Sequence, residues 1–294
     1  MPRTTDIDDP APTGQSYIER PPVPELAGLV SSVQIQQVPP GSAPYTHRNI
    51  PHGGVELVCR VGSVPRIVGP LTRPLVEVLA PGTTMVGVRF RPGAAPSVLG
   101  LPASELLDLV VGADELWGRS AVALGERIDG AASPTKALDG LQRHIAGRLG
   151  DAQGPDPLVA EAVRRLMPWR TADVGSLTSS LFISERQLRR RCQAAIGLAP
   201  KVLHRMLRFQ GFLALAQEAL ARGRTLTGDG LAVLAAEAGY ADQPHLTREC
   251  LRLTGVTPRT FLRQTEQSCG CGHDHAASFR PMLRWRPAPD PAPV

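Results

Sequence analysis

Two stretches decide the fold of this chain: ISERQLRRRCQAAIGLAPKVLHRMLRF at residues 183–209 and AAEAGYADQPHLTRECLRLTGVTPRTFL at residues 235–262. They are copies of one pattern, because seven pairs of residues are each offset by 58 positions. The pairs are Ser184 and Asp242, Leu188 and Leu246, Arg190 and Arg248, Cys192 and Cys250, Gly197 and Gly255, Pro200 and Pro258, and Lys201 and Arg259. Such a fixed offset indicates an internal repeat of one structural unit.

Each copy predicts a capped helix. In the first copy, the Ser184 side chain offers an oxygen to the free N–H groups of the first turn. Leu188 and Cys192 lie four residues apart on one face and point inward, which makes the cysteine a core residue. Gly197 ends the helix, and Pro200 opens the next one. The equivalent residues of the second copy predict the same structure.

The surrounding sequence extends each copy to a helix-turn-helix unit. Short helical patterns at residues 174–181 and 231–238 precede the two capped helices. Between the copies, residues 200–221 are typical of a single helix that ends at Gly223. At about 1.5 Å per residue this helix spans ~32 Å. Successive major grooves on one face of DNA are separated by ~34 Å.

The outward face of the first capped helix is basic. Arg186, Arg189 and Arg190 are spaced i, i+3 and i+4, so three guanidinium groups can bind guanine edges or phosphates. The second helix presents Gln243, Pro244, Thr247 and Arg248 and is less basic. A basic helical face by itself is usually only solvated. The repeat, the caps and the spacer together favour DNA reading.

These residues resemble the DNA-binding domain of the AraC/XylS transcription regulators, most specifically in GYADQPHLTREC and GVTPRTF. The resemblance covers about a third of the chain and implies a double helix-turn-helix domain. The candidate DNA-binding residues are Ser184, Glu185, Arg186, Arg189, Arg190, Gln243, Pro244, Thr247 and Arg248. Two residues depart from the pattern. Phe182 stands where the first turn usually has glycine, and Pro244 removes a side-chain donor from the second helix.

Charge is distributed unevenly along the chain. The net charge is +5, with +7 in residues 160–268 and −3 in residues 1–159. A basic block beside an acidic one is typical of a nucleic-acid-binding module joined to another domain. The chain has no apolar run near the ~20 residues that span a bilayer. The polar N-terminus is not a signal peptide, and five cysteines fit a reducing compartment. We therefore expect a cytoplasmic protein.

The first half of the chain predicts an α+β domain, with short antiparallel strands followed by helices. Period-two alternation and Pro-Gly or Gly-Gly turns predict strands at residues 30–38, 55–61, 66–68, 76–79 and 85–90. Helices are expected at residues 95–99, 104–110, 113–127 and 135–149. The whole fold is then an α+β domain followed by an all-α domain, with two helix-turn-helix subdomains joined by a long helix.

IPHGGVELVCRVG and the sequence that follows resemble an N-terminal domain found ahead of AraC-type modules in actinobacterial regulators. This resemblance implies a regulatory or dimerising role and an unknown effector. His47, His52 and Cys59 are either a metal set or, more often in such positions, structural residues. Arg89 and Arg91 either hold an anionic ligand or form a solvated strand edge.

The expected domain organisation has five parts. They are a disordered N-terminus (1–16), a regulatory or dimerisation domain (17–149), a linker (150–157), the double helix-turn-helix domain (158–266) and a Cys/His- and Pro-rich tail (267–294).

The tail contains CGCGHDHA, with Cys269, Cys271, His273 and His275 at alternate positions. Two thiolates and two imidazoles suit tetrahedral Zn²⁺ or another transition metal. The alternative is a flexible end that binds stray metal weakly.

The sequence therefore predicts a sequence-specific DNA-binding transcription regulator, with metal or redox sensing through the tail as the alternative. Double-stranded DNA is the expected partner, RNA polymerase a further one, and both monomer and homodimer are open. An enzyme is not expected, because the chain lacks HExxH, GxSxG, a Walker loop and GxGxxG. A methyl-accepting zinc thiolate domain is also disfavoured, because residues 1–159 contain only Cys59.

Overall fold

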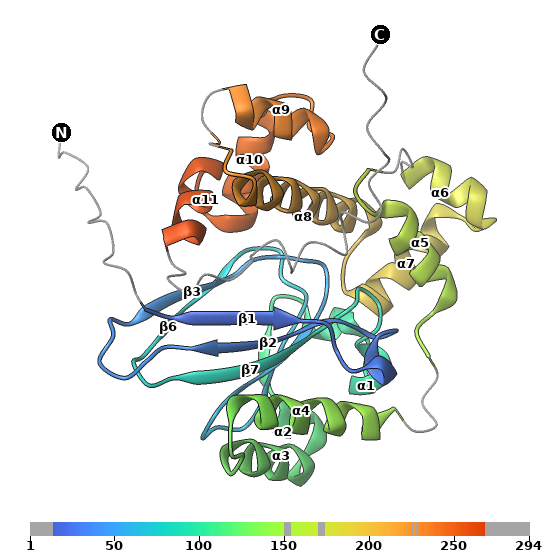
Figure 1. Ribbon diagram of the computed structural model, residues 1–294. Coiled ribbons are helices and arrows are strands. Elements are labelled where there is room, and N and C mark those ends of the chain that lie inside the picture. Colours follow the sequence, from blue (N-terminus) through green and yellow to red (C-terminus); the bar gives the residue numbers. More distant parts are fainter. Residues whose placement is uncertain (1–13, 150–153, 170–173, 225, 227–228, 268–294) are drawn as a thin grey trace, which may run out of the picture.

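The computed structural model describes residues 14–149, 154–169, 174–224, 226 and 229–267. Figure 1 shows two layers, a sheet with helices on its lower side and a helical assembly above it. We call residues 14–149 the N-terminal part and residues 154–267 the C-terminal part. Within the described stretches, no helix is long and apolar enough to cross a membrane.

Six strands form an antiparallel sheet in the order β1-β2-β7-β4-β5-β8. They are β1 (Ser16–Arg20), β2 (Val30–Gln37), β4 (Glu56–Arg60), β5 (Arg66–Val68), β7 (Thr84–Phe90) and β8 (Val110–Gly112). A second antiparallel pair consists of β3 (Tyr45–Asn49) and β6 (Leu75–Leu79). Alternation along β2 separates two chemistries, since Val33 and Ile35 belong to the apolar core while Gln34 and Gln36 are buried on the opposite face.

Helices α2 (Ala113–Trp117), α3 (Arg119–Asp129) and α4 (Pro134–Arg148) lie on the lower side of the sheet (Figure 1). Their inward residues, such as Leu124 and Leu141, are fully buried in the same core as Val33 and Ile35 of β2. The remaining helices of this part are short. They are α1 (Pro96–Leu99) and two 3-10 helices, Pro24–Leu26 and Ala103–Leu106.

The predicted α+β class and the five predicted strands are confirmed, but three strands were not predicted. β1 was missed because SYIER shows no clean alternation, and its first residue was assigned to a disordered end. Ser16 instead pairs with Gln37 of β2. β3 was missed because YTHRN carries no aliphatic residue and so shows no hydrophobic alternation.

Two helix predictions were wrong in detail. The predicted helix at 104–110 is a 3-10 helix that ends at Leu106, and β8 then begins at Val110. This strand forms because Val110 pairs with Val68 at the sheet edge, a partner that local sequence does not reveal. The predicted helix at 113–127 is two helices, because the chain breaks at Gly118.

The C-terminal part is entirely helical in its described residues, as expected. Its helices are α5 (Pro157–Leu166), α6 (Val174–Leu181), α7 (Glu185–Ile196), α8 (Pro200–Ala221), α9 (Asp229–Glu237), α10 (Gln243–Thr254) and α11 (Pro258–Gln267). The predicted linker extends too far, because Asp156 caps α5 and Pro157 is its first residue. The long spacer α8 crosses the centre of this part, and its Phe209 and Phe212 are fully buried.

Candidate nucleic-acid interface

The first candidate reading helix, α7, begins with a reciprocal cap. The Gln187 N–H donates to Ser184 Oγ at 3.2 Å, and the Ser184 N–H donates to Gln187 Oε1 at 2.9 Å. The Ser184 hydroxyl also donates to Gln187 Oε1 at 3.1 Å. Ser184 therefore serves first as the helix cap, and only a lone pair of its exposed oxygen is left for another partner.

Helix α7 separates its inward and outward residues cleanly. Leu188 and Cys192 are buried, whereas Arg186, Arg189 and Arg190 are exposed. Among the described residues these three guanidinium groups form no ion pair. Glu185, in the first turn, is also exposed. The neighbouring Arg191 is different, because it donates to Asp156 Oδ2 at 2.6 Å.

That ion pair anchors the helix. Asp156 is also the N-cap of α5, so Arg191 ties α7 to the start of the first helix of the C-terminal part. The three exposed arginines thus lie on a helix that buries Leu188 and Cys192 and is tied to α5 by a fourth arginine.

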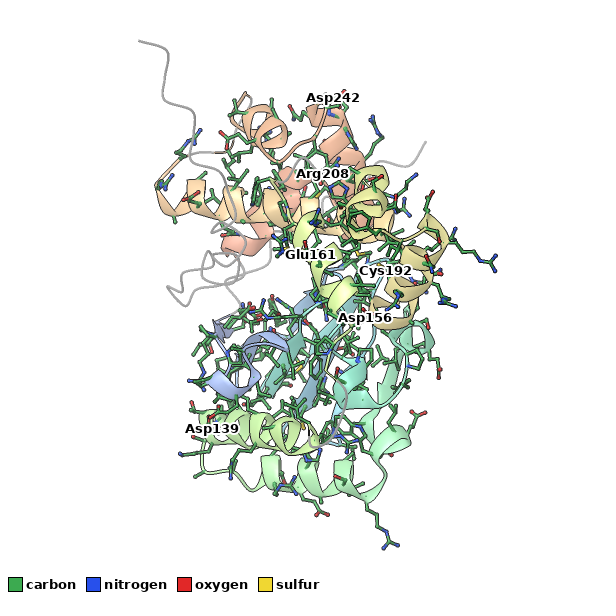
Figure 2. All side chains as sticks on the ribbon, turned by 90° about the vertical axis from the view of Figure 1, so that its right-hand side faces the viewer. Asp139, Asp156, Glu161, Cys192, Arg208 and Asp242 are labelled. Atoms are coloured by element: carbon green, nitrogen blue, oxygen red, sulfur yellow. The ribbon has the colours of Figure 1, made fainter. Side chains whose placement is uncertain are left out.

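The second candidate reading helix, α10, has the same construction with different side chains. Asp242 caps it by accepting from the His245 N–H at 2.6 Å. Leu246 and Cys250 are buried. A bidentate ion pair joins Glu249 to Arg205 of α8, with N–O distances of 2.6 and 2.9 Å. Figure 2 shows Asp242, at the start of α10, at the end of the molecule remote from the N-terminal part.

The outward face of α10 offers less charge. Gln243, Pro244 and Arg248 are exposed, and Thr247 is half-buried. The Thr247 hydroxyl donates to the Gln243 carbonyl oxygen at 3.0 Å, so it can offer only an acceptor and a methyl group. Arg248 and the Gln243 amide are therefore the side-chain donors available on this face.

The two turns that precede these helices differ. Phe182 has φ of 53° and is 93% exposed, so a bulky residue adopts the left-handed conformation that the resemblance assigns to glycine. The second turn uses Gly239, with φ of 79°. The second turn is also two residues longer, because two residues separate the end of α6 at Leu181 from the Ser184 cap, whereas four separate the end of α9 at Glu237 from the Asp242 cap.

Comparison with known families agrees with this geometry. Residues 177–264 match the family described as a helix-turn-helix domain, which is of the AraC type. The C-terminal part is an AraC-type helix-turn-helix domain. The chain is accordingly a DNA-binding transcription regulator. Residues 18–112 match a domain of unknown function, DUF6597.

Solved structures show a weak likeness to the whole chain. ToxT from Vibrio cholerae O395 is 9% identical with a TM-score of 0.41, over 85% of this chain and 97% of that one. ToxT solved with a methylnaphthalenyl butenoic acid is 11% identical with a TM-score of 0.44, over the same shares. None of the curated proteins matches the chain. The assignment of the AraC-type domain therefore depends on the family match and the helix geometry.

A hollow of about 350 Å³ lies beside the reading face of the second AraC-type unit. Gln243 and Thr247 line it from α10, and Thr257, Pro258 and Arg259 line it from the start of α11. Thr257 and Arg259 were not among the residues predicted to bind DNA. The Thr-Pro-Arg run at a helix start was the signal, since a helix N-terminus beside a cation favours an anion.

The repeat-equivalent thiols lie in the core, as predicted. Burial, with a smaller contribution from Asp156, raises the pKa of Cys192 to about 11. Burial also raises the pKa of Cys250 to about 11, against the lowering effect of a hydrogen bond with Thr254. Both side chains act as apolar fillers of the AraC-type domain.

The possible metal site of His47, His52 and Cys59 in the N-terminal part is not formed. Cys59 belongs to the apolar core on the helix side of the sheet. His52 lies instead 3.4 Å from Glu56, and burial lowers its pKa. Within the described residues no group of three potential ligands is found. Cys269, Cys271, His273 and His275 lie outside these residues.

Arg89 is not at a solvated strand edge, because β7 lies between β2 and β4. Its side chain donates to Glu56 Oε1 at 2.7 Å and to Glu19 Oε1 at 3.2 Å. Burial alone would lower the pKa of Arg89, but the two carboxylates outweigh it and hold the pKa well above its usual range. Burial would likewise raise the pKa of Glu56, but Arg89 and His52 hold it far below its usual range. With two carboxylates around it, Arg89 has little charge left for an anionic ligand.

Arg91 is exposed and donates to the Ala27 carbonyl oxygen at 2.9 Å.

Proposed function

We propose that this regulator reads two successive major grooves of one DNA duplex with α7 and α10. One observation carries the proposal: two equivalently capped helices, each anchored by an ion pair, are joined by the 22-residue helix α8. The spacing predicted for that helix is close to one turn of DNA. Base contacts would come from Glu185, Arg186, Arg189, Arg190, Gln243, Pro244, Thr247 and Arg248, with Ser184 at the helix start.

Phosphate contacts would supply most of the affinity and base contacts the choice of sequence. Helix α7 has three unpaired arginines in the described structure. It would therefore contribute more of the electrostatic attraction to DNA than α10 does. In the second unit, Arg259 and the start of α11 beside the hollow would accept a backbone phosphate. Both roles follow from exposed cations next to helix N-termini.

The experiment compares Arg190→Ala and Arg248→Ala on a duplex selected from random DNA by the unmodified chain. Each variant should bind this duplex more weakly by about 1–3 kcal/mol, the scale of one bidentate base contact. Arg119→Ala is the matched control, since Arg119 is exposed on α3, on the lower side of the sheet. Unchanged affinity in both test variants would remove these residues from the interface.

The N-terminal part would regulate this binding in response to an effector. Its support is a polar cluster on the face of the sheet opposite the helices, where the Tyr17 hydroxyl donates to Gln34 and to Glu19. Since one chain carries both reading helices, a monomer suffices, and a homodimer is equally compatible. Acting at promoters in the bacterial cytoplasm, such a regulator would also meet RNA polymerase.

A metal-responsive tail is the second candidate, supported by four soft ligands within seven residues, Cys269, Cys271, His273 and His275. Native mass spectrometry should show one zinc or copper ion on the full chain and none on a Cys269→Ser/Cys271→Ser variant. Equal metal content in the two proteins would rule out this site.

A further inference from the structure

The N-terminal part contacts both reading helices at the same position of the repeat. That position is the glycine after each helix, Gly197 in the first copy and Gly255 in the second, with φ of 81° and 78°. A Cβ on Gly197 would lie 2.8 Å from Pro70 Cγ and 2.9 Å from the Ala103 carbonyl oxygen. A Cβ on Gly255 would lie 3.5 Å from an Arg48 guanidinium nitrogen. One domain therefore meets two equivalent helix ends.

Arg48 adds a hydrogen bond to the contact with the second copy. Its guanidinium donates to the Thr254 carbonyl oxygen at 2.7 Å. Thr254 is the last residue of α10, so this carbonyl is one of the four that a helix leaves without an internal partner. A cation at this end is also favoured by the helix dipole. Arg48, on β3, thus supplies a cap to a helix more than two hundred residues later in the chain.

The chain segment that follows Arg48 also contacts the spacer. The Gln210 amide of α8 donates to the Pro51 carbonyl oxygen at 3.0 Å, and this bond is buried. A Cβ on Gly53 would lie 2.6 Å from Leu203 of α8. Ile50 packs against the apolar core of the C-terminal part. Residues 48–53 therefore contact both the spacer and the second reading helix.

The first copy is held by other segments of the N-terminal part. Besides Pro70 and Ala103 at Gly197, Gly93 approaches α5 and α7, where a Cβ would lie 3.2 Å from Val159 Cγ1 and 3.7 Å from Ile196 Cγ1. Both helix-turn-helix units therefore contact one sheet domain through separate segments.

These contacts leave the reading faces uncovered. They lie at the C-terminal ends of α7 and α10, whereas the candidate DNA-binding side chains lie in the first two turns and all but Thr247 are exposed. Figure 2 shows Asp242, where α10 begins, at the far end of the molecule from the N-terminal part, and Cys192, late in α7, close to it. The arrangement can orient the helices without blocking DNA.

We infer that the N-terminal part is a clamp that sets the relative placement of the two reading helices, and that Arg48 is the positioning residue for the second. This inference rests on the proposed two-groove reading. Two reading units held at the separation of two half-sites bind them more tightly than two units whose separation varies. The reason is that the first pair loses less conformational entropy on binding. The clamp supplies that fixed separation.

The same segment connects the clamp to the buried charges of the sheet. Asn49 donates to Glu56 Oε2 at 2.6 Å, and His52 lies 3.4 Å from Glu56 Oε1. Both residues flank Ile50 and Pro51, and Glu56 is bound by Arg89. A ligand that rearranges these buried groups would move residues 48–53, and with them the second reading helix.

The test uses the full chain and three DNA probes. The first is the duplex selected by the unmodified chain, the second has its second half-site scrambled, and the third has base pairs inserted between the half-sites. Arg48→Ala should bind the first probe about tenfold more weakly, the scale of one charge-assisted hydrogen bond. On the scrambled probe, Arg48→Ala and the unmodified chain should have equal affinity. The inserted base pairs should reduce the affinity of Arg48→Ala by a smaller factor than they reduce that of the unmodified chain.

Arg60→Ala is the matched control, because Arg60 is an exposed arginine at the end of β4. It should behave like the unmodified chain on all probes. Arg48→Lys keeps the positive charge at the helix end and should recover part of the loss. Thermal unfolding of each variant separates a loss of folding from a loss of positioning.

Two outcomes with Arg48→Ala would overturn the inference by themselves. Arg48→Ala could equal Arg60→Ala on every probe, or it could bind the selected duplex more tightly, which would make the contact inhibitory. If no duplex is selected, or if both Arg190→Ala and Arg248→Ala leave the affinity unchanged, the proposed function falls as well. If Arg190→Ala weakens binding and Arg48→Ala does not, only the clamp falls.

Discussion

The two helix-turn-helix units share a framework and differ in their surfaces. In both, an oxygen side chain caps the candidate reading helix, a leucine and a cysteine fill the core, and a left-handed glycine ends the helix. Outside this framework, the first two turns of α7 present three unpaired arginines within the described structure, while those of α10 present Arg248 with Gln243 and Pro244. The preceding turns also differ, with Phe182 in the first and Gly239 in the second.

This difference shows which positions of the repeat must keep the same type of residue. Positions that cap a helix or fill the core are chemically equivalent in the two copies, because one backbone geometry requires them. Exposed positions do not affect that geometry, so they differ and can give each unit its own DNA preference. Three predictions test how far the equivalence of the framework extends.

The largest effect is expected in the core. Leu188→Ala and Leu246→Ala should each lower the free energy of unfolding by about 2–5 kcal/mol, because both side chains are buried and their removal leaves a cavity. Urea denaturation followed by circular dichroism measures the loss. If the copies are equivalent, the two values agree to within about 1 kcal/mol. A loss in only one variant would show that the units contribute unequally to the core.

The next effect concerns the two buried thiols. A thiol with a pKa of about 11, as at Cys192 and Cys250, is ionised at least a hundredfold less at pH 8 than an ordinary cysteine. Alkylation of both should therefore be at least about a hundredfold slower in the native chain than in urea, and should accelerate as pH rises towards 11. Peptide mass spectrometry after an iodoacetamide pulse resolves the two sites. Labelling of one site at the rate seen in urea would show that its unit is open.

The smallest effect is expected in the turns. Phe182→Gly should raise the free energy of unfolding by about 1 kcal/mol, because glycine adopts the left-handed conformation without strain and little contact is lost. Gly239→Ala should lower it by a similar amount. Phe182→Ala is the control, since alanine removes the ring but keeps the strain. Destabilisation by Phe182→Gly would mean that the exposed ring has a stabilising role.

The sequence alone determined much of the C-terminal part. Ser184, Gly197 and Pro200 act through hydrogen bonds and dihedral angles within a few residues of themselves. Their repetition at a constant offset therefore predicted α6, α7, α8 and α10 and the candidate reading faces. The hydrophobic alternation of β2 and β7 was likewise local and was predicted correctly.

Only the tertiary structure decided the features that depend on distant partners. β8 is a strand because Val110 meets Val68, and Arg89 is a buried ion-pair residue because β7 occupies the middle of the sheet. Arg48 was not singled out, because its partner, the Thr254 carbonyl oxygen, is a backbone atom in another domain. Any residue type at position 254 carries that oxygen, so no side-chain pattern marks the contact. Packing of the two parts, and not local sequence, brings Arg48 to the end of the second reading helix.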